Sequence, residues 1–242
     1  MDAYGKAVVF DCDGTLTTKE IRSLMYCVDS GTLSEQARER GMAMRRRYLP
    51  LAQAGTMTAA EEADWLRGTL QLYIDDGLTM DRIRASLAGV PLRPGAAECL
   101  RLLHAHGIPV AVVSYGVRAF VEAFLEANGI GRCVNDIYSA VLEPAGPDGR
   151  FSSYRPDSFV FPSNKGLWSR RFAWAQRVPK ENLFAVGDSL GDRRLGFRKE
   201  RRLGIAKDAA EAALLAPHMG RVVISDSFEP VTAWLKEELH LA

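Results

Sequence analysis

Two aspartates, Asp11 and Asp13, carry the most informative chemistry in this sequence. The apolar run from Ala7 to Phe10 predicts a buried strand, and side chains two residues apart on extended backbone point the same way. Both carboxylates therefore face one ligand, while Cys12 points elsewhere and is expected to pack against the sheet. Like charges this close repel, and a divalent cation or a shared proton relieves the repulsion. Taken alone, the pair allows a metal site, a phosphoryl acceptor or a turn.

Polar groups also follow or flank later predicted elements. Ser114, Tyr115 and Gly116 follow residues 108–113 of the predicted strand 108–114, and a run from Gly187 to Asp192 follows the strand 183–186. Lys165 begins a predicted helix, 165–176. Each residue singly has a structural explanation, since Ser caps helices and Asp-Gly forms turns. Open parallel sheets bind ligands at the carboxyl ends of their strands, however, so we expect these groups to meet as a set.

The elements that must position them alternate between helix and strand. Helices are predicted at 95–106, 117–128 and 165–176, and strands at 108–114, 134–142, 183–186, 203–206 and 222–224. Such alternation specifies parallel strands with crossover helices, so the predicted fold class is α/β with a doubly wound, Rossmann-like parallel sheet. The run from Pro144 to Gly149 predicts a turn into a strand at 150–154, and a final helix is expected to cover the edge of the sheet.

Residues 18–90 carry helical signals and no convincing strand. Thr32 with Glu35, and Thr58 with Glu61, have the spacing of capping boxes. The prolines that follow, from Pro91, return the chain to the sheet. We therefore predict a core domain of residues 1–17 and 91–242, with an inserted all-helical cap domain at 18–90.

Bulk properties limit the partners. The 31 Lys and Arg residues nearly balance 30 Asp and Glu residues, and the net charge of +1 gives no reason to expect nucleic acid or membrane binding. Small molecules are the expected partners, and the oligomeric state is left open. Neither a signal peptide nor a transmembrane helix is evident, so the cytoplasm is the expected location. The four cysteines are scattered, which predicts reduced thiols and no zinc site or disulfide framework.

The ordered set of groups resembles the haloacid dehalogenase superfamily of phosphohydrolases, whose four motifs run in the same order along the core. The resemblance implies an enzyme that uses Mg²⁺, with Asp11 as nucleophile and Asp13 as general acid and base. It implies phosphate binding by Ser114, Tyr115, Gly116 and Lys165. It implies metal ligation by Asp11, Asp13 through its carbonyl group and Asp188, supported by Ser189 and Asp192.

The inserted helices match the first cap type of this superfamily and resemble two of its branches. The sequence around Arg47 and Tyr48, with Trp65, is similar to the pyrimidine 5′-nucleotidases, in which aromatic residues of the cap can stack on a base. Glu20 instead stands where phosphoserine phosphatases place a carboxylate for the substrate amine. We retain Glu20, Arg47, Tyr48 and Trp65 as candidate substrate contacts. Core packing of the aromatics, capping by Glu20 and solvation of the basic run 45–47 are the structural alternatives.

The leading hypothesis is a Mg²⁺-dependent phosphomonoesterase that acts through an aspartyl phosphate on a small metabolite. A nucleoside 5′-monophosphate is one candidate substrate, and phosphoserine or another small phosphate ester is the alternative. Hydrolytic dehalogenation is a second class, although it needs neither Asp13 nor a metal carboxylate. A non-catalytic regulatory protein on the same scaffold is the third.

Overall fold

Strand β1 (Ala7–Phe10) is fully buried, as its unbroken apolar sequence predicts. The computed structural model describes residues 5–21, 23–54, 56–145 and 148–241. Among these residues, strands pair in the order β4-β3-β2-β1-β5-β6-β7 in one sheet. The other strands are β2 (Val110–Val117), β3 (Asp136–Ala145), β4 (Arg150–Arg155), β5 (Leu183–Gly187), β6 (Arg202–Ala206) and β7 (Arg221–Ile224).

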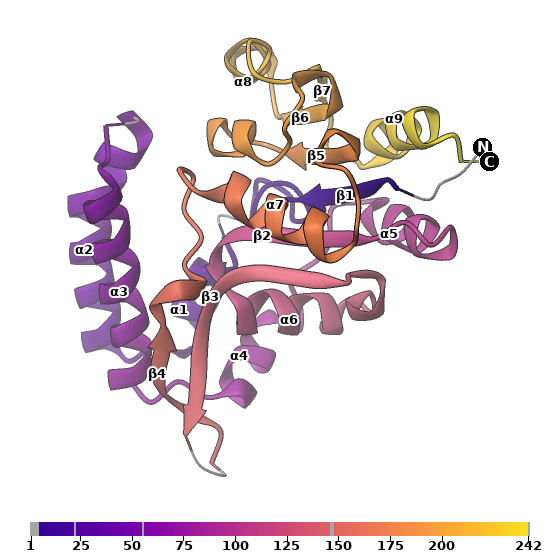
Figure 1. Cartoon of the computed structure of the whole chain (residues 1–242). Coiled ribbons are helices and arrows are strands. Elements are labelled where there is room, and N and C mark those ends of the chain that lie inside the picture. The colour runs from indigo at the N-terminus through magenta and orange to yellow at the C-terminus, as the bar shows by residue number, and fades with distance from the viewer. Residues whose placement is uncertain (1–4, 22, 55, 146–147, 242) are drawn as a thin grey trace.

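All neighbouring strands are parallel except β3 and β4, which pair antiparallel. Helices cover the sheet in Figure 1 as crossover connections require. The predicted α/β class with a doubly wound parallel sheet is therefore confirmed. Strand β3 runs farther than predicted, to Ala145. Two residues of the predicted turn into β4, Gly146 and Pro147, lie outside the described part of the chain.

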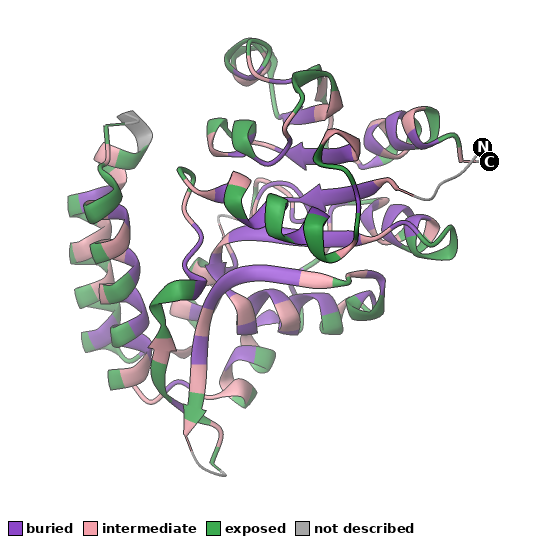
Figure 2. Cartoon of the chain, viewed as in Figure 1, coloured by how far each residue is buried: buried purple, intermediate pink, exposed green. Residues whose placement is uncertain are grey.

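The helices of the sheet layers are α5 (Ala96–Ala105), α6 (Arg118–Ala127), α7 (Lys165–Ala175), α8 (Ala209–Leu215) and α9 (Glu229–Leu239). Alternate residues of β1 face opposite layers. Val8 and Phe10 join the cluster that holds residues of α5, α6 and α9, whereas Ala7 and Val9 pack toward α7. Figure 2 shows the inner strands β1, β2 and β5 buried, whereas β4 and β7 at the two edges of the sheet are largely exposed or intermediate.

The final helix reaches the edge strand β7 through Glu237, which lies 3.5 Å from Arg221, but its apolar side packs on the face of the sheet. Trp234 of α9 packs against Phe184 of β5, an interior strand, with ring centroids 5.8 Å apart. The helix packs on the face of the sheet because its apolar residues, including Val231 and Leu235, are buried there against the apolar side chains of the strands. The edge on this side of the sheet is β7.

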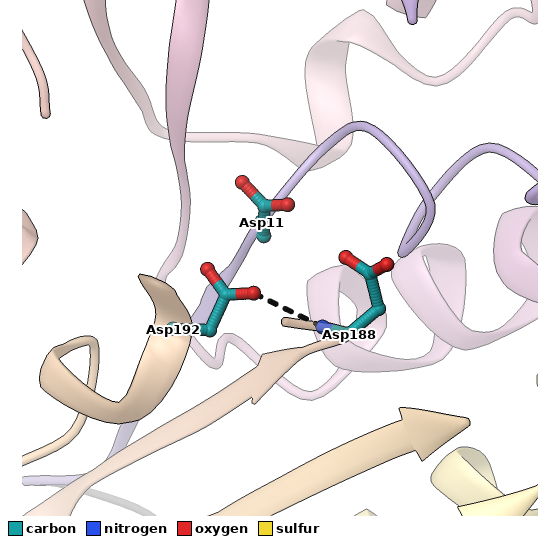
Figure 3. Close-up of side chains that lie close together, drawn as sticks. All are labelled: Asp11, Asp188 and Asp192. Atoms are coloured by element: carbon teal, nitrogen blue, oxygen red, sulfur yellow. Dashed lines mark hydrogen bonds between the residues drawn. The ribbon is translucent and has the colours of Figure 1, made fainter. Parts of the chain in front are cut away.

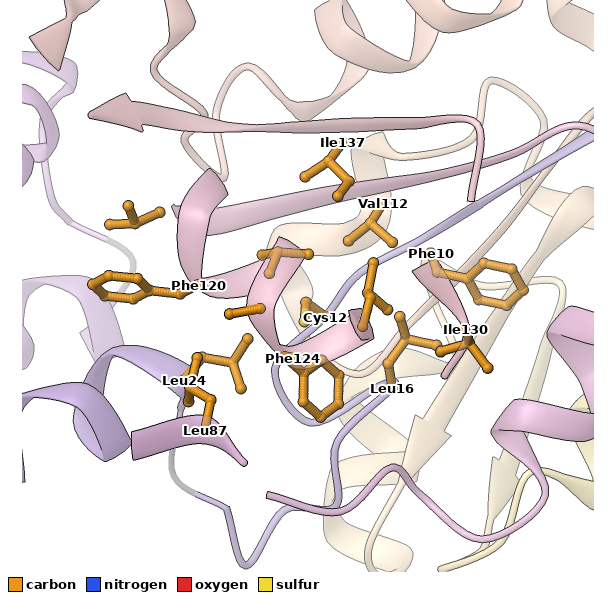
Figure 4. Close-up of a cluster of buried hydrophobic side chains, with 14 of the residues drawn as sticks. Phe10, Cys12, Leu16, Leu24, Leu87, Val112, Phe120, Phe124, Ile130 and Ile137 are labelled. Carbon is orange, nitrogen blue, oxygen red and sulfur yellow. The ribbon is translucent and has the colours of Figure 1, made fainter. Parts of the chain in front are cut away.

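Residues 18–90 form four helices in the described part: α1 (Leu24–Thr32), α2 (Glu35–Ala54), α3 (Ala59–Asp75) and α4 (Met80–Leu87). Leu24 of α1 and Leu87 of α4 belong to the same apolar cluster as Phe10 and Phe120 (Figure 4). The inserted helices are therefore anchored on the sheet layers by shared apolar packing. Their division from the rest as a separate cap domain stays a prediction.

Two predicted helix starts have different outcomes. The Thr58 and Glu61 capping box is present at the start of α3. The box predicted at Thr32 is wrong, because Thr32 is the last residue of α1 and its hydroxyl donates to Val28 O. Ser34 takes the capping role, since its side chain accepts from Ala37 N at 3.2 Å.

The cysteines are free, and Cys12 is buried in the apolar cluster (Figure 4), as predicted. Among the described helices, none combines the length and apolarity needed to cross a membrane.

Candidate active site

Lys165 joins two carboxylates from different elements. It is the first residue of α7, it is buried, and its Nζ lies 2.6 Å from Asp11 Oδ1 and 2.6 Å from Asp192 Oδ1. These two carboxylates raise the pKa of Lys165 despite its burial, so the ammonium stays protonated. Burial raises the pKa of Asp11, with Lys165 opposing the shift and Asp192 and Asp188 adding to it. Asp11 is therefore a desolvated carboxylate oriented by a fixed cation.

Asp192 organises the loop after β5. Its Oδ2 accepts from the amides of Asp188 at 3.1 Å and Ser189 at 2.9 Å, and from the Ser189 hydroxyl at 2.7 Å. Gly187 is required there, because a Cβ on it would lie 2.3 Å from Asp192 Cβ. With Lys165 on its other oxygen, Asp192 is fully engaged. It supports both Asp188 and Lys165, and it has little capacity left to ligate a metal directly.

Asp188 lies beside the loop after β1. Its Oδ1 accepts from the Thr15 hydroxyl at 3.3 Å, and its Oδ2 lies 3.2 Å from Lys19 Nζ. Gly14 has a φ of +77°, and a Cβ there would lie 2.4 Å from Asp188 Oδ2. Glycine at this position therefore serves both the turn and the approach of Asp188. Burial, and then Asp192, raise the pKa of Asp188 to about 6.

The carboxylates of Asp11, Asp188 and Asp192 form a cluster in which one oxygen of each lies within 4.8 Å of one oxygen of the others. Figure 3 shows the three side chains converging from β1 and from the loop after β5. Oxygen donors with surplus negative charge suit Mg²⁺, so the residues present fit that ion. Because Asp192 is engaged by Lys165 and the loop amides, Asp11 and Asp188 are the better ligands. The carboxylate of Asp13 is not part of this cluster.

Asp13 faces the inserted helices. Its Oδ1 accepts from the backbone amide of Leu24, the first residue of α1, at 2.8 Å. Burial raises the pKa of Asp13 to about 6, although this amide and Lys165 lower it. A carboxyl group that exchanges its proton near neutral pH suits general acid and base work.

Ser114 lies within β2, not after it as predicted, together with Tyr115 and Gly116. The pairing of β2 with β3 is irregular there. Val113 pairs with Tyr138 and Val117 with Ala140, so a step of four residues along β2 corresponds to a step of only two along β3. Such a bulge breaks the regular ladder and redirects side chains. It explains how Ser114 and Tyr115 reach the pocket from inside a strand.

A pocket of about 360 Å³ joins these groups to the inserted helices. Trp65, Arg45 and Asp29 line it from the helical side, together with Met25, Gly41, Leu66, Thr69 and Leu72. Ser23, at the start of α1, also lines it from the helical side, and the lining residues on the sheet side are Asp11, Asp13, Ser114, Tyr115, Pro162, Lys165, Asp188, Ser189 and Gly191. The pocket therefore has a polar, charged end at the sheet and a mixed end on the helices.

Five predicted site residues do not line this pocket, and one of them, Asp192, acts instead through its contacts with Asp188 and Lys165. Glu20 is exposed, and a hydrogen bond with Thr18 lowers its pKa. Tyr48 is buried and stacks behind Trp65, with ring centroids 5.8 Å apart, and Arg47 lies over the Tyr48 ring. Gly116 is also absent from the lining. Tyr48 is thus used for core packing, which was the structural alternative, whereas Trp65 lines the pocket.

Three residues in or beside the pocket were not predicted individually as site residues: Asp29, Arg45 and Lys19. Asp29 accepts from the buried Tyr73 hydroxyl at 2.8 Å, and burial raises the pKa of Asp29 to about 6. Arg45 was considered only as part of the basic run. Lys19 lies in the loop beside Asp188. An acidic residue among the apolar positions of a helix, next to Val28, was the available signal for Asp29.

A family model for haloacid dehalogenase-like hydrolases matches residues 8–196, which include every strand-end group described above. The chain belongs to this family. The predicted superfamily is therefore confirmed, as is the expectation of an enzyme.

Several relatives of known name are phosphatases. The chain is 28% identical over 225 residues to a phosphoserine phosphatase of Streptomyces coelicolor, a match that covers 90% of this chain and 49% of that protein. It is also 28% identical to a 2-hydroxy-3-keto-5-methylthiopentenyl-1-phosphate phosphatase of Microcystis aeruginosa, over 93% of this chain and 95% of the relative. The chain thus spans about half the length of the phosphoserine phosphatases that it matches, and nearly all of the Microcystis protein.

Solved structures share the fold at lower identity. Cytosolic 5′-nucleotidase IIIB bound to cytidine superposes with a TM-score of 0.80, at 17% identity, over 99% of this chain and 89% of that chain. A phospho-aspartyl intermediate analogue of phosphoserine phosphatase superposes with a TM-score of 0.66, at 18% identity, over 95% and 98%. Both predicted branches are therefore structural neighbours.

Proposed function

We propose that this protein is a phosphomonoesterase that transfers the phosphoryl group of a small organic phosphate to Asp11 and then to water. The observation that carries the proposal is the position of Lys165, whose Nζ lies 2.6 Å from both Asp11 and Asp192 at the sheet end of the pocket. A buried nucleophile beside a fixed cation suits an anionic substrate, because the cation offsets the charge of nucleophile and phosphate together.

The remaining groups divide the reaction between them. Ser114 and the neighbouring backbone of Tyr115 bind phosphoryl oxygens from the bulged strand. Asp13 donates a proton to the leaving alcohol and afterwards takes one from the water that attacks the aspartyl phosphate. Its pKa of about 6 allows both protonation states near neutral pH.

Asp11 and Asp188, with the backbone carbonyl of Asp13, would hold Mg²⁺, and Asp192 would fix Asp188. When bound, the ion supplies charge neutralisation for the phosphoryl oxygens. The raised pKa of Asp188 and the close carboxylate cluster support this assignment, since repulsion among these groups is relieved by a cation.

The helical end of the pocket would read the leaving group. Trp65 offers an aromatic surface, while Asp29 and Arg45 offer charges of opposite sign. A nucleoside 5′-monophosphate fits the aromatic surface, and the nucleotidase neighbour supports it through the fold. A phosphoamino acid is the alternative that the phosphoserine phosphatase relatives suggest. Glu20, the carboxylate first considered for a substrate amine, lies outside the pocket, so Asp29 takes its place in that alternative.

The test is the variant Asp11→Asn, assayed with Mg²⁺ on a generic aryl phosphate and on a panel of nucleotides, phosphoamino acids and sugar phosphates. We expect turnover to be abolished while the melting temperature is kept. Mass spectrometry of the rapidly quenched parent should detect a phosphoryl group on Asp11. The matched control is Asp64→Asn, since Asp64 is exposed on α3 and does not line the pocket. Parental turnover by Asp11→Asn would refute the mechanism.

The same panel separates the other functional classes. Chloride release from a haloacid, unaffected by chelation, would favour a dehalogenase. Absence of turnover on every phosphate ester with Mg²⁺ would favour a regulatory protein. Retention of Asp11, Asp13, Lys165 and Asp188 in one pocket supports catalysis over both.

A further inference from the structure

A second lysine, Lys19, contacts the carboxylate of Asp188, and the proposed reaction does not use it. Its Nζ lies 3.2 Å from Asp188 Oδ2 and donates to the Asp188 backbone oxygen at 3.3 Å. Its side chain is 21% exposed, and that of Asp188 is 14% exposed, so water screens the pair only in part. Lys19 therefore places a positive charge on a carboxylate that is expected to bind a divalent cation.

Glu211 offers Lys19 a second partner outside the pocket. Lys19 Nζ lies 2.5 Å from Glu211 Oε2, and Glu211 is in the first turn of α8. Glu211 is held in place there, because its Oε2 accepts from the backbone amide of Lys207 at 3.0 Å. Lys19 is thus shared between a carboxylate of the site and a carboxylate beyond it.

We propose that Lys19 is an internal counter-ion that lowers the affinity of the Asp188 site for divalent cations. Glu211 partly restores this affinity, because the Lys19 ammonium can pair with Glu211 instead of Asp188. The inference rests on the proposed function in one respect, the binding of Mg²⁺ at Asp188. A cation that binds Asp188 must either displace the Lys19 ammonium or accept a like charge beside it. Both alternatives lower the affinity of Asp188 for the cation. In both, the negative charge of Glu211 stabilises the Lys19 ammonium and so makes the loss of affinity smaller.

Lys19 also has an opposing effect on metal binding, through its hydrogen bonds to Asp188. A hydrogen bond to the free oxygen of a ligating carboxylate orients the ligand, and such contacts usually strengthen metal binding. Here Thr15 already donates to Asp188 Oδ1, and Asp192 holds the Asp188 backbone amide, so the orientation does not depend on Lys19 alone. Repulsion between like charges in a poorly solvated site is therefore the larger effect.

Calorimetric titration of the full chain with Mg²⁺, repeated with Mn²⁺ by electron paramagnetic resonance, tests the inference without an activity assay. Lys19→Gln keeps a hydrogen-bond donor and removes the charge, and it should bind Mg²⁺ about tenfold more tightly. Lys19→Arg keeps the charge and should resemble the parent.

Glu211→Gln, which leaves Asp188 untouched, should weaken Mg²⁺ binding by roughly threefold to tenfold. The change in Mg²⁺ affinity caused by Glu211→Gln should be smaller in a Lys19→Gln background, because Glu211 acts on the site mainly by pairing with Lys19. The matched control is Lys207→Gln: Lys207 Nζ also pairs with Glu211, at 3.3 Å, but the pairs described for Asp188 do not include it. That variant should stay within about twofold of the parent, because a solvent-exposed pair has little effect.

Equal or weaker binding by Lys19→Gln would overturn the inference and leave Lys19 as an orienting donor. If the parent binds Mg²⁺ normally in that case, the proposed function is unaffected. If neither the parent nor Lys19→Gln binds Mg²⁺, both the inference and the metal assignment fail. Melting temperatures of the metal-free variants confirm that each one is folded, and Glu211→Gln tests the sign independently should Lys19→Gln not fold.

Discussion

Asp13 accepts a hydrogen bond from the backbone amide of Leu24 at 2.8 Å, which ties the proposed acid and base to the first turn of α1. The positive end of a helix stabilises a carboxylate, and Ser23 caps the same helix end by accepting from Tyr26 N. The proton affinity of Asp13 therefore depends on the position of the first inserted helix.

Replacing Asp13 by Asn separates the two roles of its carboxylate. The amide oxygen still accepts from Leu24, so the melting temperature should stay close to that of the parent. The side chain no longer transfers a proton, and kcat should fall by about 10² to 10⁴. Steady-state kinetics on an aryl phosphate and thermal unfolding check both expectations. Asp13→Ala should lose activity and also stability, and near-parental kcat for Asp13→Asn would remove Asp13 from proton transfer.

Mg²⁺ affinity should fall as the pH is lowered through about 6. Burial and Asp192 raise the pKa of Asp188 to about 6 in the metal-free site, so below that pH a proton must leave before the carboxylate ligates an ion. The apparent dissociation constant should then rise by up to about tenfold for each pH unit below 6. Calorimetric titration at pH 5, 6 and 8 measures this. An affinity that does not change over this range would show that Asp188 is not a ligand.

The sheet side of the site was predictable from sequence, and the reason is geometric. Parallel strands end at one edge, so the residues after β1 and β5 had to meet wherever the strands were correctly assigned. Asp11, Lys165, Asp188 and Asp192 all meet in the structure within a few ångströms. Ser114 was also predicted at the correct edge of the sheet. The bulge that lets it reach the pocket from inside β2 has no clear signal in the sequence.

The helical side was not predictable in the same way. Each residue of a helix turns the side-chain direction by about 100°, so Arg45 and Arg47, two residues apart, differ by about 200° and point to opposite sides of α2. Which side faces the pocket depends on how α2 packs against α3, and a mixed composition such as that of α2 does not determine it. The structure turns Arg45 toward the pocket and leaves Arg47 over Tyr48. Tyr48 and Trp65 were likewise indistinguishable as aromatics, and one is buried behind the other.

Asp29 should make the protein less stable as the pH rises. Burial raises the pKa of Asp29 to about 6, so between its ordinary value near 4 and about 6 the folded state binds more protons than the unfolded state. Stability from this group is therefore greatest at low pH and is lost as the pH rises through that window.

Asp29→Asn cannot ionise but still accepts from the Tyr73 hydroxyl. Relative to the parent, its melting temperature should be higher by a few degrees, roughly, at pH 8 and little changed at pH 4. Thermal unfolding at the two pH values measures the difference. Asp64→Asn on the exposed side of α3 should show no such pH-dependent gain. A gain of equal size at both pH values would mean that ionisation of Asp29 is not its source.

Trp65 should discriminate between flat aromatic leaving groups and small aliphatic ones. It lines the pocket while Tyr48 stacks against it, 5.8 Å away with an interplanar angle of 18°, so the indole is held firmly for a ligand to stack on. Stacking of a base on an aromatic side chain contributes about 1–3 kcal/mol. Trp65→Leu should therefore raise KM for a nucleoside monophosphate by about tenfold or more, and change KM for phosphoserine by less than about threefold.

The matched control for Trp65 is Trp174→Leu, because Trp174 is 82% exposed on α7 and does not line the pocket. It should leave KM for both substrates unchanged. The ring of Trp65 also meets that of Tyr115 edge-on at 6.2 Å, so its loss could instead disturb the phosphate site. In that case kcat would fall equally for both substrates with little change in the KM ratio. That result would assign Trp65 to the support of Tyr115 and leave recognition of the leaving group to Asp29 and Arg45.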